Sequence, residues 1–130
     1  MARDPRKLEV FELADNLVLE LYRCTRAFPS EERYGLQSQL RRAAVSVPTN
    51  IVEGCARPTE RDYLHFMSMA YASASEVGYL LTIAQRLGYL SEAERTALED
   101  PYDKLSRSLR KLVDRVREQP QAASRKPQAD

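Results

Sequence analysis

The chain has 130 residues, of which 43% are hydrophobic and 30% charged, and its 20 Lys and Arg residues against 19 Asp and Glu give a net charge of +1. This length suffices for one hydrophobic core but not for two, and the four glycines are too few for a turn-rich β fold. The balanced charge excludes a global field that would attract nucleic acid or anionic membranes, so any such binding needs a local patch.

No residue pattern indicates a metal site, a cofactor site or a targeting signal. Cys24 and Cys55 have no second Cys or His at metal-ligand spacing, so we expect reduced thiols without a metal. Residues 1–7 are polar and mixed in charge, with no apolar segment of signal-peptide length behind them, and no apolar run is long enough to span a membrane. We therefore expect a cytoplasmic protein that has no cofactor and no membrane contact.

The first half of the chain predicts two amphipathic helices. Over residues 8–28, apolar residues recur at three- and four-residue steps, and this pattern stops before Pro29. A second helix is expected over residues 36–53, with Gly54 as its C-terminal stop. Because Pro48 removes a backbone donor and clashes with the carbonyl one turn back, we expect a kink inside the second helix.

A third helix is predicted over residues 60–87, where Thr59 and Asp62 are spaced as an N-cap with a reciprocating acid. Two rows of apolar and small residues run along this segment, which is more than one bundle core needs. The helix is therefore either a central, heavily buried one or part of a subunit interface that uses small residues for close approach. The small residues in question are Ala72, Ser73, Ala74 and Ser75.

The last helix is expected to begin after Gly88, which has the position of a glycine C-cap for the third helix. Ser91 and Glu94 form a capping box at its start. Pro101 predicts either a short helix followed by a long one or a single kinked helix to residue 118, and the kinked helix is favoured. Residues 119–130 are polar and contain proline, which indicates a disordered tail.

Four amphipathic segments with short connections predict an all-α fold, an antiparallel up-down-up-down four-helix bundle over residues 1–118. The physical reason is that short loops make consecutive helices antiparallel neighbours. The surplus apolar surface of the third helix further favours assembly of this bundle into a homo-oligomer.

No nucleotide-binding loop, dinucleotide fingerprint or zinc-protease helix signature occurs in the sequence, so we expect no enzymatic activity. His65 is the only histidine, and just one acid, Asp62, lies among its helical neighbours. A general base needs a partner within hydrogen-bond reach, and a surface or interface histidine is the commoner case.

A polar cluster is predicted on the second helix, where three- and four-residue steps place several polar side chains on one side. One explanation is a shared functional site. The favoured one is structural, because polar side chains beside a proline kink can satisfy backbone groups and pair with one another. The members are Arg42, Ser46, Asn50 and Glu53, with Glu76 of the third helix as a candidate fifth.

The C-terminal region is basic, since residues 101–130 carry eight Lys or Arg against four acids, whereas residues 58–100 carry three against seven. On a helical wheel, four basic residues form a stripe opposite the apolar side of the last helix. Such a stripe is usually a solvated face, and it lacks interleaved aromatic residues for base stacking. As candidate nucleic-acid contacts we nevertheless take Lys104, Arg107, Lys111 and Arg115, together with Arg41 of the second helix.

Two blocks of the sequence resemble a known bacterial family. The first block consists of Phe28-Pro29, Glu32, Gly35-Leu36 and the unbroken run from Gln39 to Gly54. The second consists of Asp62-Tyr63-Leu64, Phe66, the run from Ala70 to Ser73, Glu76, Ala84 and Leu87-Gly88-Tyr89. The chain resembles the "four helix bundle protein" family, also called 23S rRNA-intervening-sequence proteins, over nearly its whole length except the termini. It departs from the family pattern at Val52, where alanine is usual, and at Tyr71-Ala72, where a basic residue and glycine are usual.

The resemblance implies a four-helix bundle in a cyclic pentamer. This architecture is similar to that of the accessory protein of diversity-generating retroelements, which binds a reverse transcriptase and nucleic acid. No enzymatic activity is attached to the family. Two functions therefore remain open: an oligomeric scaffold that contacts RNA or DNA, and a protein-protein assembly or adaptor module without nucleic-acid contact.

Overall fold

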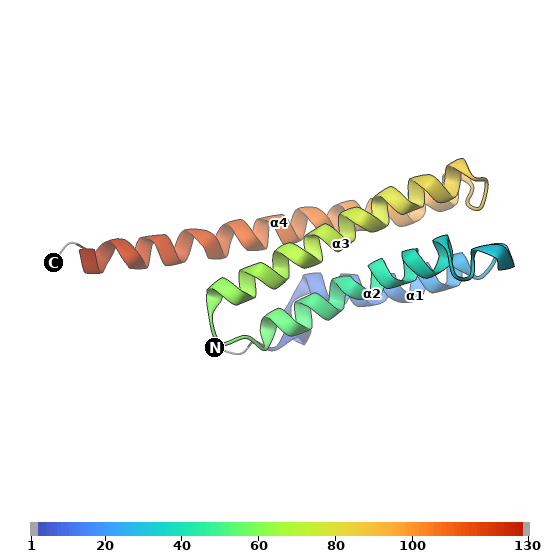
Figure 1. Ribbon diagram of the computed structural model, residues 1–130. Helices are drawn as coiled ribbons and strands as arrows, with labels where there is room; N and C mark the ends of the chain where they lie inside the picture. Colours follow the sequence, from blue (N-terminus) through green and yellow to red (C-terminus); the bar gives the residue numbers. More distant parts are fainter. Residues whose placement is uncertain (1–2, 129–130) are drawn as a thin grey trace.

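Four long α-helices make up the computed structural model, which describes the backbone of residues 3–128 and the side chains of residues 3–118 (Figure 1). The helices are α1 (Glu9–Thr25), α2 (Leu36–Cys55), α3 (Glu60–Arg86) and α4 (Glu92–Gln128). Two short 3-10 helices, η1 (Pro5–Lys7) and η2 (Ser30–Glu32), precede α1 and α2. Residues 3–128 contain no strand, so the predicted all-α class is confirmed.

The helices lie side by side around a common core. Both α1 and α3 pack against α2 and α4, so the contacting pairs close into a ring. In Figure 1 the α1–α2 and α3–α4 connections lie at one end of the molecule, and the α2–α3 connection lies at the other, near the N-terminus. This packing is compatible with a four-helix bundle. At the N-terminal end, α4 extends past the other helices (Figure 1).

The core absorbs much of the apolar surface of α3. Ala70, Val77 and Leu80, which belong to one of its two predicted rows of apolar and small residues, are buried inside the subunit. Ala74 is also buried, at 2% exposure, so its predicted place at a subunit interface is wrong. Ala72 is exposed and remains available for a partner. Within the described residues, α3 nevertheless packs against α2 and α4 alone and leaves Met69 and Tyr79 exposed, so its part in a subunit interface stays a prediction.

The predicted N-cap at Thr59, glycine C-cap at Gly88 and capping box at Ser91 are confirmed, whereas the expected return bond from the Asp62 carboxylate to the Thr59 N–H is not formed among the described residues. Thr59 Oγ1 accepts a hydrogen bond from the Asp62 backbone N–H at 3.2 Å. Gly88 adopts a φ of +82°, the left-handed conformation that ends α3 and that favours glycine. Ser91 Oγ accepts from the Glu94 N–H at 3.1 Å, while Glu94 Oε1 accepts from the Ser91 N–H at 2.8 Å, which completes the capping box.

Two predicted helix ends are wrong. α1 ends at Thr25 rather than Phe28. Its end is marked by three-residue turns, in which the Arg26 N–H donates to the Arg23 carbonyl and the Phe28 N–H donates to the Thr25 carbonyl, and the position before Pro29 disfavours helical backbone at Phe28. Gly54 is not the stop of α2, since the helix continues to Cys55. A Cβ at Gly54 would lie 2.7 Å from Met67 Cε, so this glycine lets α2 approach α3 closely.

Both internal prolines are accommodated without a break. α2 runs continuously through Pro48, and α4 is a single helix through Pro101, as predicted. The kinks expected at these positions stay predictions. The backbone of α4 remains helical to Gln128. The predicted division at residue 118 stays untested, because the side chains from residue 119 and all of residues 129–130 lie outside the described part.

Candidate functional site

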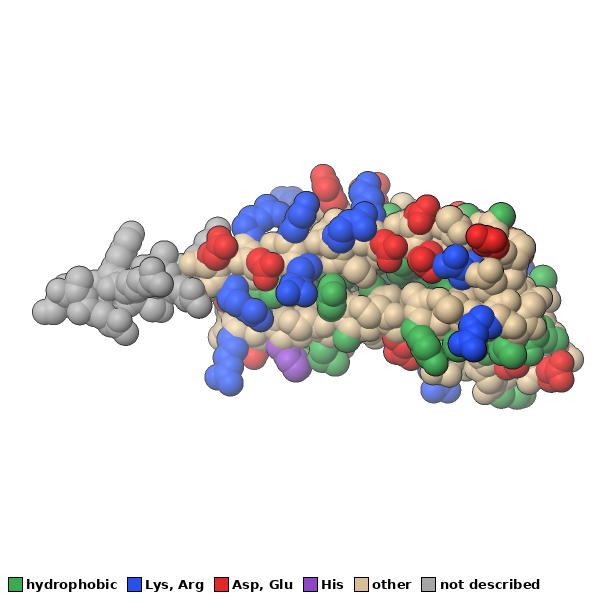
Figure 2. Space-filling view, turned by 90° about the horizontal axis from the view of Figure 1, so that it is seen from above, with side chains coloured by type: hydrophobic (Ala, Val, Ile, Leu, Met, Phe, Trp, Pro, Cys, Tyr) green, Lys and Arg blue, Asp and Glu red, His purple; other side chains and the backbone are tan. Residues whose placement is uncertain are grey.

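The predicted basic stripe lies on the outer face of α4. Lys104, Arg107, Lys111 and Arg115 are all exposed, while Leu105 and Leu109 on the opposite side are fully buried. Figure 2 views the molecule from the side of α3 and α4, and its Lys and Arg side chains gather toward the half from which the grey C-terminal residues leave. The structure therefore brings these four predicted residues together on one surface.

The four cations of this α4 stripe have no ion-pair partner among the described side chains. The one ion pair of the α4 segment from residue 101 to 118 joins Arg110 to Asp114 at 3.9 Å. Among the described side chains, no carboxylate lies within 4 Å of the four stripe residues. A phosphate could therefore approach them without displacing an intramolecular partner.

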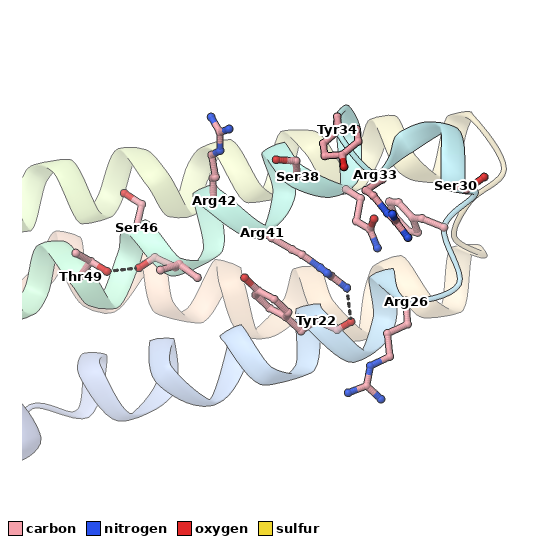
Figure 3. A pocket seen from close by; sticks show the side chains of 13 residues that line it. Tyr22, Arg26, Ser30, Arg33, Tyr34, Ser38, Arg41, Arg42, Ser46 and Thr49 are labelled. Carbon is pink, nitrogen blue, oxygen red and sulfur yellow. Dashed lines mark hydrogen bonds between the residues drawn. The ribbon is translucent and has the colours of Figure 1, made fainter.

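A second basic region lies where the end of α1 meets the start of α2. It is a surface hollow of about 930 Å³, which we call the arginine hollow. Its lining includes four arginines and no carboxylate. In Figure 3, Arg33 and Arg41 point into the space between the two helices, whereas Arg26 and Arg42 point outward at its edges. The lining residues are Tyr22, Arg26, Phe28, Ser30, Arg33, Tyr34, Gln37, Ser38, Arg41, Arg42, Val45, Ser46 and Thr49.

Arg41 holds this region together. Its Nε donates to the hydroxyl of the fully buried Thr25 at 2.9 Å, and its Nη2 donates to the Tyr22 carbonyl at 3.2 Å. The guanidinium also lies over the Tyr22 ring, 4.4 Å from the centroid, and Gln37 Nε2 donates to the Thr25 carbonyl at 2.8 Å. The last carbonyls of a helix lack intrahelical donors and carry partial negative charge, which explains a cation here.

The tertiary structure therefore separates Arg41 from the rest of the predicted nucleic-acid residues. Arg41 belongs to the arginine hollow on α2, and the other four belong to α4, which does not pack against α2 within the described residues. Whether Arg41 contacts nucleic acid stays a prediction.

The α1–α2 connection is fixed by Glu32. Its Oε1 accepts from the Leu36 backbone N–H at 2.9 Å, and its Oε2 accepts from the Tyr89 hydroxyl at 2.8 Å. Both hydrogen bonds lower the pKa of Glu32, and the one from the Leu36 backbone has the larger effect. The hydrogen bond between Tyr89 and Glu32 also raises the pKa of Tyr89. A Cβ at Gly35 would lie 2.6 Å from Glu32 Oε1, so glycine leaves the room that this carboxylate needs.

The predicted polar cluster forms in part. Ser46 Oγ hydrogen-bonds Ser73 Oγ at 2.8 Å, and Asn50 Nδ2 donates to the Ser46 carbonyl at 2.8 Å and to its hydroxyl at 3.0 Å. The Ser46–Ser73 bond joins α2 to α3, whereas the Asn50 bonds lie within α2, and together they support the structural explanation for Ser46 and Asn50. The exposed Arg42 and Glu76 line a smaller hollow of about 490 Å³ that also contains Ser46.

Glu53, the remaining predicted member of the cluster, is exposed. The described side chains offer it no cation within 4 Å, so its predicted pairing with an arginine is wrong in this subunit. Glu53 faces solvent because it lies one residue before Gly54, where α2 turns its other side toward α3.

No described side chains form a recognisable catalytic grouping. His65 is exposed and contacts the edge of the Phe66 ring. Burial raises the pKa of both free thiols, Cys24 and Cys55, which disfavours their nucleophilic thiolate forms. Burial likewise raises the pKa of Tyr102, whose hydroxyl lies in the core. Over the described residues there is no cluster of metal-ligating side chains, and no helix long and apolar enough to cross a membrane.

Comparison with known proteins identifies the family. The family model for 23S rRNA-intervening sequence proteins matches residues 6–111. The chain belongs to this family. No curated protein matches the chain. A crystal structure of a protein of unknown function from the S23 ribosomal protein family of Bacteroides thetaiotaomicron is similar in fold, with a TM-score of 0.75 and 15% identity over 81% of this chain and 95% of that chain.

Two of the three departures from the family pattern lie on the surface. Val52 is 43% exposed, and Ala72 is also exposed, so neither changes the packing of helices inside the subunit. The third, Tyr71, is half-buried and packs against the core.

Sequence reasoning missed most of the arginine hollow. Arg26, Arg33 and Tyr34 belong to no helical stripe, because they lie at the end of α1 and in the connection that follows. A usable signal was present all the same, since a short connection brings the end of one helix beside the start of the next. The basic residues before and after the α1–α2 connection could therefore have been expected to lie near one another.

Proposed function

We propose that the protein is a non-catalytic, oligomeric helical-bundle scaffold of the cytoplasm that binds RNA or DNA. The exposed α4 stripe carries this proposal, because its four cations face solvent and no described carboxylate lies within 4 Å of them. Cations without intramolecular partners can bind phosphates and release condensed counterions.

The assembly we propose is an antiparallel up-down-up-down bundle repeated in a cyclic homo-oligomer, with the pentamer implied by the family resemblance. Exposed apolar side chains on α2 and α3 support such contacts, since Val45, Val52 and Met69 are 38%, 43% and 43% exposed. A ring would repeat the α4 stripe around its circumference and multiply weak phosphate contacts.

The alternative is a protein-protein adaptor without nucleic-acid contact. The same apolar side chains favour it, because they could contact a different protein instead of a second copy of this chain. Co-purification with one protein in fixed stoichiometry and without nucleic acid would support this alternative.

The decisive experiment measures binding of fluorescent single- and double-stranded RNA and DNA over a range of salt concentrations, with the mass of the assembly determined by light scattering. We expect log affinity to fall linearly with log salt, and the double variant Lys104→Gln/Lys111→Gln to reduce this slope by about 1.4 for single strands. Arg61→Gln/Arg86→Gln removes two exposed cations from α3 and serves as the matched control. Absence of binding at low salt would disprove nucleic-acid binding, and a monomeric mass would disprove the oligomer.

A further inference from the structure

The arginine hollow concentrates positive charge without compensation among its lining residues. Four guanidinium groups line it, and the lining contains no Asp or Glu. Arg26, Arg33 and Arg42 are exposed and have no carboxylate within 4 Å among the described side chains. Because like charges repel, a bound anion would stabilise this arrangement.

Part of the hollow is rigid before any ligand arrives. Arg41 is anchored to α1 through Nε and Nη2, while its Nη1 makes no hydrogen bond within the described structure. A guanidinium carries five N–H donors, so donors remain for a ligand. The half-buried Ser38 and the exposed Ser30 add hydroxyl groups to the lining.

An aromatic platform lies beside the charges. The Tyr34 side chain is 90% exposed, the largest exposure among the large hydrophobic residues of the described part, and it lines the same hollow. An uncovered aromatic ring next to arginines can stack with a nucleobase while the guanidinium groups bind the phosphate. Figure 3 shows Tyr34 beside Arg33 at the start of α2.

We propose that the arginine hollow binds a nucleoside monophosphate unit, with the phosphate monoester on Arg33 and Arg41, which both point into it, and the base on Tyr34. In the context of the proposed function, on which this inference rests, that unit is the 5′-terminal nucleotide of a single strand. A monoester carries about −1.5 to −2 charges at neutral pH, which suits several arginines better than the single charge of an internal diester. The volume of about 930 Å³ matches a pocket for one small ligand and not a duplex.

The test compares two short, single-stranded RNAs that carry a fluorophore at the 3′ end and differ only in a 5′-phosphate or a 5′-hydroxyl. Fluorescence anisotropy with the full chain measures each affinity, and adenosine 5′-monophosphate and inorganic phosphate serve as competitors. The 5′-phosphate is expected to raise affinity about tenfold, the effect of one charge-assisted hydrogen bond.

The diagnostic variant is Arg33→Gln, which removes an exposed side chain without a hydrogen-bond partner among the described residues. It should abolish the preference for the 5′-phosphate, while Arg61→Gln/Arg86→Gln retains it. Tyr34→Ala should weaken competition by adenosine monophosphate severalfold and leave that by inorganic phosphate unchanged. Variants of the α4 stripe such as Lys104→Gln/Lys111→Gln should lower the affinity for both RNAs by the same factor.

The outcomes separate this inference from the proposed function. If both RNAs bind alike and Arg33→Gln changes nothing, the inference is overturned while nucleic-acid binding stands. If adenosine monophosphate binds and Arg33→Gln abolishes this binding but no RNA binds, the hollow takes a free nucleotide and the scaffold function fails. If inorganic phosphate competes as well as the nucleotide and Tyr34→Ala has no effect, the hollow recognises an anion alone and the nucleotide assignment is overturned.

Discussion

The α4 stripe and the arginine hollow are both basic, yet they are built in different ways. The stripe consists of cations on one helix, at steps of three and four residues, and none of them contributes a described hydrogen bond to the fold. The hollow combines residues from α1, the connection and α2, and one of its cations, Arg41, bonds α1 to α2. A charge in the first region is therefore available for binding alone, whereas a charge in the second also contributes to stability.

The largest effect is expected for Arg41→Met, which should lower the free energy of unfolding by about 1–2 kcal/mol. This figure lies toward the low end of what hydrogen bonds to charged groups contribute, because Arg41 is partly exposed to solvent. The buried Thr25 hydroxyl loses its donor in this variant. Urea denaturation measures the change. Arg107→Met makes the same substitution in the stripe and should stay within about 0.5 kcal/mol of the wild type. Equal losses in both variants would remove the distinction between the regions.

A smaller effect is expected where the polar cluster adjoins the hollow. A double-mutant cycle of Ser46→Ala and Ser73→Ala should give a coupling of about 0.5–1 kcal/mol, because their hydroxyls bond each other at 2.8 Å. Denaturation of the four proteins measures the coupling. Ser108→Ala on α4 is the control. A coupling near zero, combined with lost ligand binding, would assign this pair to a binding site instead of the fold.

The pH dependence of stability should report on the Glu32 anchor. Because the folded state lowers the pKa of Glu32 from its usual value of 4.5, this group stabilises the fold above about pH 4.5 and loses its contribution as the pH falls through the folded value. Glu32→Gln should therefore flatten the fall of the melting temperature at acid pH. The exposed Glu53→Gln should follow the wild-type curve, and identical curves for all three proteins would contradict the role of Glu32.

The smallest predicted effect concerns Glu76, which shares the smaller hollow with Arg42 and Tyr34. Glu76→Gln removes a negative charge from this neighbouring hollow, so it should raise the affinity for adenosine monophosphate about twofold at low salt. Glu118→Gln, an exposed acid of α4 that lines neither hollow, should leave this affinity unchanged. A decrease on Glu76→Gln would place the phosphate elsewhere.

Helix positions could be predicted well because their determinants are local. The capping pairs Thr59–Asp62 and Ser91–Glu94 act within a few residues, and amphipathic spacing recovers the buried face of each helix. Gly54 was misjudged because a glycine that ends a helix and a glycine that admits a neighbouring helix look alike in sequence. The neighbour, Met67 of α3, is known only once α2 and α3 have packed together.

By itself, the sequence determined an all-α chain, its family, and the presence of a basic stripe on the last helix, since each of these depends on short-range periodicity or residue identity. Only the tertiary structure decided that Arg41 serves α1, that Ala74 lies in the core, and that Arg33 and Arg42 share a hollow with Tyr34. Those outcomes depend on which helix faces are buried against one another. Buried area and hydrogen bonds between distant segments select those faces, and no local pattern encodes them.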